Sequence, residues 1–404
     1  MNTSQISRRD NFQFSMLLND KRYRSYTFQF LALLILIFIM AYLGKNLLEN
    51  LASAGLNISY SFLGEASGYD INQRLIEYNS QSTHLRAAFV GVLNTLLVAF
   101  LGCIMATVFG VTAGILRLSN NWIVAKLMMI YVEIFRNVPV LIWILIIHSV
   151  FLTILPQPKE FRGENPEASM LWDAVAFTGR GIYVPKPIFY DGSAVVIATF
   201  ILSIIAIFAF RFYARQKLYS AGQLIETRWT SLAIFFIPTL LVYFIMGNPV
   251  GLEYPELKGF NFKGGIYARG SLISLWFALS IYTGAFIAEV VRAGIQSVNQ
   301  GQTEAASALG LRSNLVMNLV VLPQALRVIV PPLISFYLNI TKNSSLALAV
   351  GYMDVTGTLG GITLNQTGRA IEAVLLLMLF YLVISLSISA IMNVYNRSIM
   401  LKER

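Results

Sequence analysis

The chain has 404 residues, of which 56% are hydrophobic and only 12% are charged, and its formal net charge is +10. Because soluble domains carry about 25% charged residues, this composition excludes an ordinary soluble domain and indicates a polytopic membrane protein. The positive charge needs no nucleic-acid partner, since cytoplasmic Lys and Arg beside anionic lipid explain it. We therefore expect membrane lipid, and no nucleic acid, among the partners.

Few residues in this sequence can carry catalytic chemistry. Cys103 is the sole cysteine, so neither an intrachain disulfide nor a CxxC metal site can form. The two histidines, His84 and His148, are well separated and have no nearby ligands for zinc. The sequence also lacks the GxxxxGK[ST] pattern that cradles nucleotide phosphates. We predict no catalytic residue, no metal site and no cofactor on the chain itself.

The N-terminal part has the pattern of a tail, a membrane helix and an outer loop. Residues 1–27 are polar and basic, which predicts a cytoplasmic tail, and residues 28–86 hold an apolar run followed by a mixed loop. Ala52-Ser-Ala54 resembles a signal-peptide cleavage site. The long basic lead-in instead favours a retained membrane helix followed by a periplasmic loop.

The next segment, 87–155, contains two further apolar runs. Ala87–Leu116 is uncharged and longer than the roughly 20 residues that a spanning helix needs. Its glycines are suited to close packing between helices. A second span is expected over Val138–Leu155.

Residues 156–270 have the pattern of an insertion. Apolar runs at Ala194–Phe210 and Trp229–Met246 predict two extra membrane helices. The segments flanking these runs are rich in Pro, Gly and charge or in Gly, and we expect external loops there.

Residues 271–396 supply the last spans, at Ser271–Ala288, Val328–Val350 and Ile371–Tyr395, before a short tail, 397–404. The predicted fold is thus an all-α polytopic membrane helix bundle of about eight transmembrane helices. Lys and Arg are moderately more frequent in the segments assigned to the cytoplasm, which places both termini there.

The stretch Gln300–Pro323 is polar, then helical, then abruptly apolar. Thr303 is predicted as the N-cap, with Glu304 in the first turn, and Gly310 is predicted to end the helix. A second helix should start near Ser313 and run into the membrane. Such a helix can dock into a groove on a partner, although an ordinary cytoplasmic loop would have the same pattern.

The spacing of Glu304-Ala305-Ala306, Gly310 and Leu322-Pro323 resembles the EAA loop of ABC importer permeases. Three further segments are similar to signatures of the polar amino acid permease family: Tyr131–Pro139, Glu289–Val298 with Gly301-Gln302, and Asn339–Leu346. The resemblance covers 88–155 and 271–396. The extra N-terminal segment and the insertion most resemble the general L-amino acid permease subunits of Gram-negative bacteria.

This resemblance implies a type-1 (MetI-like) ABC permease core in the bacterial inner membrane, importing L-amino acids of broad or polar and acidic type. It implies a second homologous permease subunit, two ATP-binding subunits and a periplasmic amino acid-binding protein. ATP and Mg would bind the ATPase partners, so this chain would not be an enzyme. The residues implied in ATPase coupling are Gly301, Gln302, Glu304, Ala305, Ala306 and Gly310.

A polar stripe lies within the last part of the core. Asn339, Lys342 and Asn343 recur at helical spacing, with Ser344 beside them. Because Lys at the bilayer centre costs about 2.5–3.5 kcal/mol, the stripe is expected to face the bundle interior and to line the substrate pathway. The alternatives are that Lys342 snorkels outward or forms a structural pair with Glu372.

Other features of the core have structural interpretations. Glu133 with Arg136, and Glu289 with Arg292, form two E-x-x-R patterns, which we interpret as structural charge pairs. Pro331-Pro332 is expected to interrupt its membrane helix, as a packing kink or as a bending point.

Two other classes of function compete with the ATP-driven permease. A secondary amino acid transporter driven by an ion gradient would explain the spans and the intramembrane Lys, but not the docking stretch, and no inverted repeat is evident. A membrane scaffold without transport would leave the polar stripe unexplained.

Overall fold

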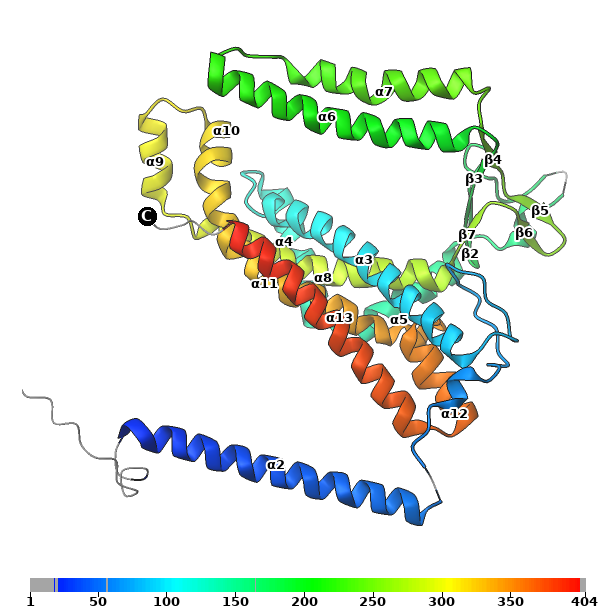
Figure 1. The fold of residues 1–404 in the computed structure, drawn as a ribbon. Coiled ribbons are helices and arrows are strands. Elements are labelled where there is room, and N and C mark those ends of the chain that lie inside the picture. Colours follow the sequence, from blue (N-terminus) through cyan, green and yellow to red (C-terminus); the bar gives the residue numbers. More distant parts are fainter. Residues whose placement is uncertain (1–17, 19–20, 56, 164, 400–404) are drawn as a thin grey trace, which may run out of the picture. The chain divides into compact units, whose positions relative to one another are not determined.

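Eight helices in the described part of the chain are long and apolar enough to cross a membrane (Figure 1). The computed structural model describes residues 18, 21–55, 57–163 and 165–399. Much of the predicted tails, 1–27 and 397–404, lies outside these residues. The candidate spans are Tyr23–Ser53, His84–Leu116, Val140–Phe161, Ser193–Ala221, Thr227–Ile245, Gly270–Gln296, Ser313–Val350 and Ala370–Ser398. The predicted all-α bundle of eight spans is confirmed.

The chain divides into two units, Met1–Phe62 and Leu63–Arg404. The first unit contains α2 (Lys21–Ser53), a helix of 33 residues. At 1.5 Å per residue it is about 50 Å long, more than the hydrocarbon thickness requires. It extends well beyond the apolar core of the N-terminal run because Leu47, Leu48 and Leu51 continue its apolar character.

Helix α8 (Gly270–Gln296) is the centre of the second unit. It packs against α3 (His84–Leu116), α4 (Trp122–Asn137), α5 (Val140–Ile154) and α11 (Leu322–Asn343). Helix α13 (Ala370–Ile399) packs on α11. Buried side chains therefore run along nearly the whole length of α8.

Glycines allow α3 and α8 to approach closely, as the sequence predicts. A Cβ added at Gly110 would lie 2.4 Å from Cβ of Ile287. One added at Gly114 would lie 2.7 Å from the carbonyl oxygen of Ala288. Neither position has room for a larger side chain, which is typical of helix contacts built on small residues.

The inserted segment forms a helical hairpin of α6 (Ser193–Ala221) and α7 (Thr227–Ile245). The two helices lie side by side in Figure 1 and pack on each other, with Phe200 edge-on to Phe235. Helix α6 ends at Gly222, whose φ of +64° suits a glycine C-cap. The two predicted extra spans are present. Helix α6 is longer than the predicted apolar run, and α7 matches its run closely.

The flanks of the hairpin contain strands, where the sequence predicts only loops. The described strands are β1 (Ala176–Thr178), β2 (Gly181–Val184), β3 (Lys186–Phe189), β4 (Val250–Glu253), β5 (Glu256–Lys258), β6 (Asn261–Lys263) and β7 (Ile266–Arg269). All pairs are antiparallel, in the orders β1-β2-β7, β3-β4 and β5-β6. Each strand has only three or four residues, so the alternation of apolar and polar residues is too short to be recognised within the surrounding loop sequence.

The last part of the core is irregular, but not at the prolines. Helix α11 runs without interruption through Pro331-Pro332, so the expected break there is wrong. A proline removes one donor, and a membrane helix can continue past it when neighbours satisfy the freed carbonyl. The irregular segments are instead π-helical at Met317–Val321 and Thr356–Thr363, and 3₁₀ at Ser344–Val350.

Candidate coupling loop and substrate pathway

The loop between α8 and α11 contains α9 (Gln300–Ala308) and α10 (Ser313–Val316). The N-cap of α9 is Asn299, whose side-chain oxygen accepts a hydrogen bond from the Gly301 amide at 2.8 Å. The prediction of Thr303 as the N-cap is therefore wrong. Asn is at least as good a cap as Thr, and it starts the helix one turn earlier.

Helix α9 ends at Gly310 as predicted. The Gly310 amide donates to the Ser307 carbonyl at 2.9 Å, and the Leu311 amide donates to the Ala306 carbonyl at 3.4 Å. This is the hydrogen-bond pattern of a Schellman motif, which requires a left-handed residue. Gly310 has φ +78°, so a residue with a Cβ would be strained there.

Helix α9 presents most of its surface to solvent. Of the residues implied in coupling, Gly301, Gln302, Glu304, Ala305 and Gly310 are exposed. Ala306 alone among them is buried, and it packs with Val316 and Val321. The contact anchors the loop to the start of the next membrane segment, while Leu309, 83% exposed, remains available to a partner.

A cluster of three arginines around one carboxylate joins the helices at this end of the core. Arg292 donates to Glu289 at 2.5 Å, as the i, i+3 pattern predicts. Arg117, at the end of α3, pairs with the same carboxylate, and Arg136 lies 3.9 Å from it. The predicted Glu133–Arg136 pair is wrong, since Glu133 instead accepts from the Asn137 side chain at 3.3 Å.

Sequence reasoning missed Arg117 because a contact across 172 residues leaves no local spacing to recognise. The available signal was that Arg117 directly follows the long apolar run Ala87–Leu116. The cluster connects α3, α4 and α8 just before the coupling loop begins, so it fixes the base of that loop.

The predicted polar stripe does not face the interior of the single chain. Asn339 and Lys342 are exposed on α11, Asn343 is half-buried, and Ser344 is buried with its hydroxyl donating to the Thr341 carbonyl at 2.7 Å. The alternative pair is also wrong, because Glu372 lies 3.5 Å from Arg369 instead. The partner Arg369 is three residues earlier in the chain, just before α13 begins.

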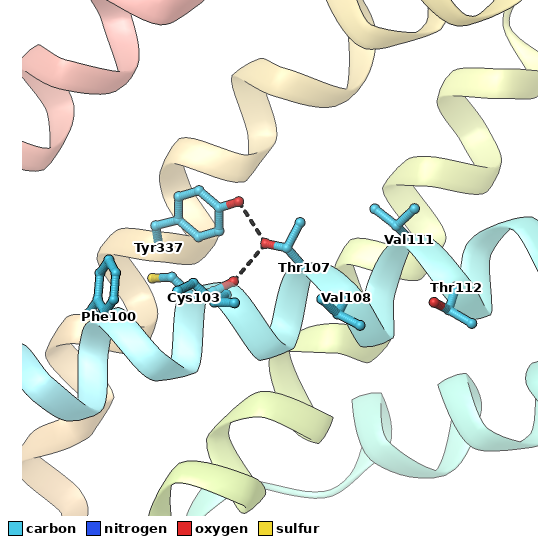
Figure 2. A pocket seen from close by; sticks show the side chains of 8 residues that line it. Phe100, Cys103, Thr107, Val108, Val111, Thr112 and Tyr337 are labelled. Atoms are coloured by element: carbon cyan, nitrogen blue, oxygen red, sulfur yellow. Dashed lines mark hydrogen bonds between the residues drawn. The ribbon is translucent and has the colours of Figure 1, made fainter. Parts of the chain in front are cut away.

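An apolar groove of about 690 Å³ lies along α3 beside α11 (Figure 2). Thr107 donates to the Cys103 carbonyl at 2.7 Å, and its hydroxyl meets that of Tyr337 at 2.7 Å. Figure 2 shows Phe100 and Val108 on the same helix, lining the groove. The surface is almost wholly apolar and therefore suits lipid or another helix better than a polar substrate.

A polar layer closes the other end of α3. The Asn94 side chain donates to the Met353 carbonyl at 2.8 Å, and Thr95 accepts from the Val355 amide at 3.1 Å. His84 meets Thr363 at 3.0 Å. Asp354 is fully buried in this layer and accepts from the Gly357 amide at 2.8 Å. These bonds hold the segment after α11 against α3.

Eight apolar helices long enough to span a bilayer define a multi-pass membrane protein. Among the described residues no group of His, Cys, Asp or Glu could hold a metal ion.

Comparison with known proteins identifies the family. Residues 227–401 match the family described as binding-protein-dependent transport system inner membrane component. The chain is 48% identical to the glutamate/glutamine/aspartate/asparagine transport system permease protein BztB of Rhodobacter capsulatus, over 97% of both chains. It is 42% identical to the general L-amino acid transport system permease protein AapQ of Rhizobium johnstonii, over 97% of this chain and 96% of that one. It is also 42% identical to the putative amino-acid ABC transporter permease protein YhdX of Escherichia coli, over 98% and 99%. The chain belongs to the amino-acid ABC transporter permeases.

Proposed function

We propose that this chain imports acidic amino acids and their amides as one permease subunit of a binding-protein-dependent ATP-driven transporter. The observation that carries the proposal is similarity along the whole chain, insertion included, to BztB, a permease named for glutamate, glutamine, aspartate and asparagine. Membership of the ABC transporter permeases argues against the alternative of a secondary transporter driven by an ion gradient.

The exposed helix α9 supports an ATPase partner. A helix that buries only Ala306 and exposes Leu309 gains little from its own fold and has surface to offer to a groove. We propose that two ATP-binding subunits hydrolyse ATP with Mg and that α9 transmits their closure to the membrane helices. Gly310 sets the direction in which the chain leaves that contact.

The exposed polar stripe supports a second permease subunit. Lys342 and Asn339 lie on the outside of a membrane helix, and a charge exposed to hydrocarbon costs about 2.5–3.5 kcal/mol. A homologous subunit facing α11 would remove that cost by enclosing a polar pathway between the two chains. In this arrangement Lys342 would meet the substrate carboxylate, with Asn339 and Asn343 beside it.

The proposed orientation puts α9 and both termini on the cytoplasmic side of the bacterial inner membrane. Eight spans return the chain to the side on which it starts. The β strands and the 54–83 loop then lie in the periplasm, where an amino acid-binding protein would deliver the substrate.

Reconstitution tests the proposal. We expect proteoliposomes holding both permeases and the ATP-binding subunits to take up L-glutamate only with ATP and a loaded binding protein, and to do so with all ion gradients collapsed. Uptake by this chain alone, driven by an imposed ion gradient, would refute the proposal.

Coupling is tested at Gly310. Because a β-branched residue at φ +78° is strained, Gly310→Val should distort the end of α9. We expect normal membrane levels with transport uncoupled from ATP hydrolysis or absent. Gly44→Val is the control, since it adds the same side chain in open space at an ordinary φ. Wild-type transport per ATP in Gly310→Val would count against the coupling role of α9.

A further inference from the structure

A polar pocket of about 480 Å³ lies at the end of α8 opposite the coupling loop. Its walls come from α5, from the first residues of α8, from the loop before α3, from the turn between β1 and β2, and from strands β6 and β7 of the insertion. Helix α8 has 27 residues and is therefore about 40 Å long, so the pocket and the loop mark its two ends. We call it the outer arginine pocket, formed by Asn72, His148, Arg180, Asn261, Arg269 and Ser271.

The pocket concentrates positive charge without a compensating acid. Arg180 and Arg269 both line it, and no Asp or Glu does. Among the described residues, neither arginine makes an ion pair. Arg180 is held by one hydrogen bond to the Phe260 carbonyl at 3.2 Å, which leaves most of its donors unused.

Strand pairing brings the two arginines together. Arg269 is the register partner of Gly181, the residue after Arg180. A Cβ at Gly181 would lie 2.4 Å from the Ala268 carbonyl oxygen, so glycine is required for this close approach. The Arg269 amide is fixed by the Gln73 side chain at 3.0 Å. The backbone pairing thus keeps both arginines among the residues that line the pocket.

Neutral donors complete the pocket. Ser271 is 2% exposed, and its hydroxyl has no hydrogen-bond partner among the described residues. The Asn261 oxygen already accepts from the Tyr183 hydroxyl at 2.9 Å, so its amide hydrogens remain as donors. A buried hydroxyl without a partner is unfavourable, and a polar ligand in the pocket would supply that partner.

We propose that the outer arginine pocket binds the carboxylates of a free acidic amino acid after the binding protein releases it and before it reaches α11. Guanidinium groups match carboxylates in a bidentate geometry, and the volume is within the range of about 300–1,000 Å³ for small-molecule sites. The inference rests on the proposed import of such amino acids. It gives the insertion a role, because Arg180 comes from the turn between β1 and β2 and Arg269 comes from β7.

The test uses the complete reconstituted transporter with Arg180→Gln, Arg269→Gln and the double variant. Lys186→Gln is the matched control, since it removes an exposed cation of the same insertion outside the pocket. Uptake of L-glutamate and of L-glutamine is measured at saturating loaded binding protein. We expect the glutamate-to-glutamine rate ratio to fall about tenfold in the double variant and to stay unchanged in Lys186→Gln.

Two results would overturn the inference. An unchanged ratio in all variants would mean that the pocket takes no side-chain carboxylate. An equal loss for both substrates, relieved by more binding protein, would mean that the arginines hold an acidic surface of that protein. If a variant assembles poorly, Arg180→Lys, which keeps the charge but not the fork, should lower the ratio partway. A wild-type transporter that moves neither substrate would instead refute the proposed function.

Discussion

Burial of Asp354 predicts that the stability of the protein depends on pH. It is fully buried and lies between the candidate spans that end at Val350 and begin at Ala370. Burial raises the pKa of the Asp354 carboxyl from 3.8 to about 7, against the lowering effect of the hydrogen bond from the Gly357 amide. The fold therefore favours the protonated, neutral form.

The sign of the pH dependence follows from that raised pKa. Below about pH 4 the carboxyl is protonated in both folded and unfolded chains, so it imposes no penalty. Between about pH 4 and pH 7 only the folded chain keeps the proton, so the free energy of unfolding falls as the pH rises. The loss is complete above pH 7, and the pKa difference corresponds to about 4 kcal/mol.

Asp354→Asn should remove this penalty, because the amide is neutral at every pH and its oxygen can still accept from Gly357. We expect a higher melting temperature than wild type at pH 8, with the gain shrinking toward pH 5, measured by tryptophan fluorescence in detergent at fixed salt. Asp70→Asn is the control, since that side chain is 65% exposed and should show no such trend. An equal change at both pH values would refute the reasoning.

Three further predictions concern packing and topology. Glu289→Gln leaves three guanidinium groups around a neutral side chain and should lower the melting temperature, by about 1–3 kcal/mol of stability, whereas Glu133→Gln should change it little. Gly110→Val must displace Ile287 across a 2.4 Å approach, and should cost at least 1–3 kcal/mol and reduce the amount of folded protein in membranes. A variant whose sole cysteine is at position 215 should resist an impermeant thiol reagent in intact spheroplasts; labelling there would reverse the proposed orientation of α6.

The sequence predicts features that depend on length, local spacing or backbone conformation. The eight spans were predictable from the apolar runs. The turn at Gly310 was predictable because glycine commonly follows the last residue of a helix. Proline and cap positions were less predictable, because several residues can do the same task. Asn299 capped α9 in place of Thr303, and α11 continued through Pro331.

Contacts between distant segments could not be predicted from spacing. The Arg117–Glu289 pair and the partner strands of the insertion join residues far apart in the chain. Nor could one chain show what covers Lys342, because its exposed side is completed by another subunit in the proposed assembly. Helices α9 and α10 were predicted apart from the N-cap of α9, because both lie within one continuous stretch of sequence.

The pairing of β2 with β7 has a consequence for how the family can vary. The register runs from Gly181 opposite Arg269 to Val184 opposite Ile266, so everything between residues 184 and 266 leaves and returns through one pair of strands. Helices α6 and α7 lie between these two strands in the chain and pack on each other. The hairpin of α6 and α7 can therefore be exchanged as a unit while the transporting core keeps its geometry.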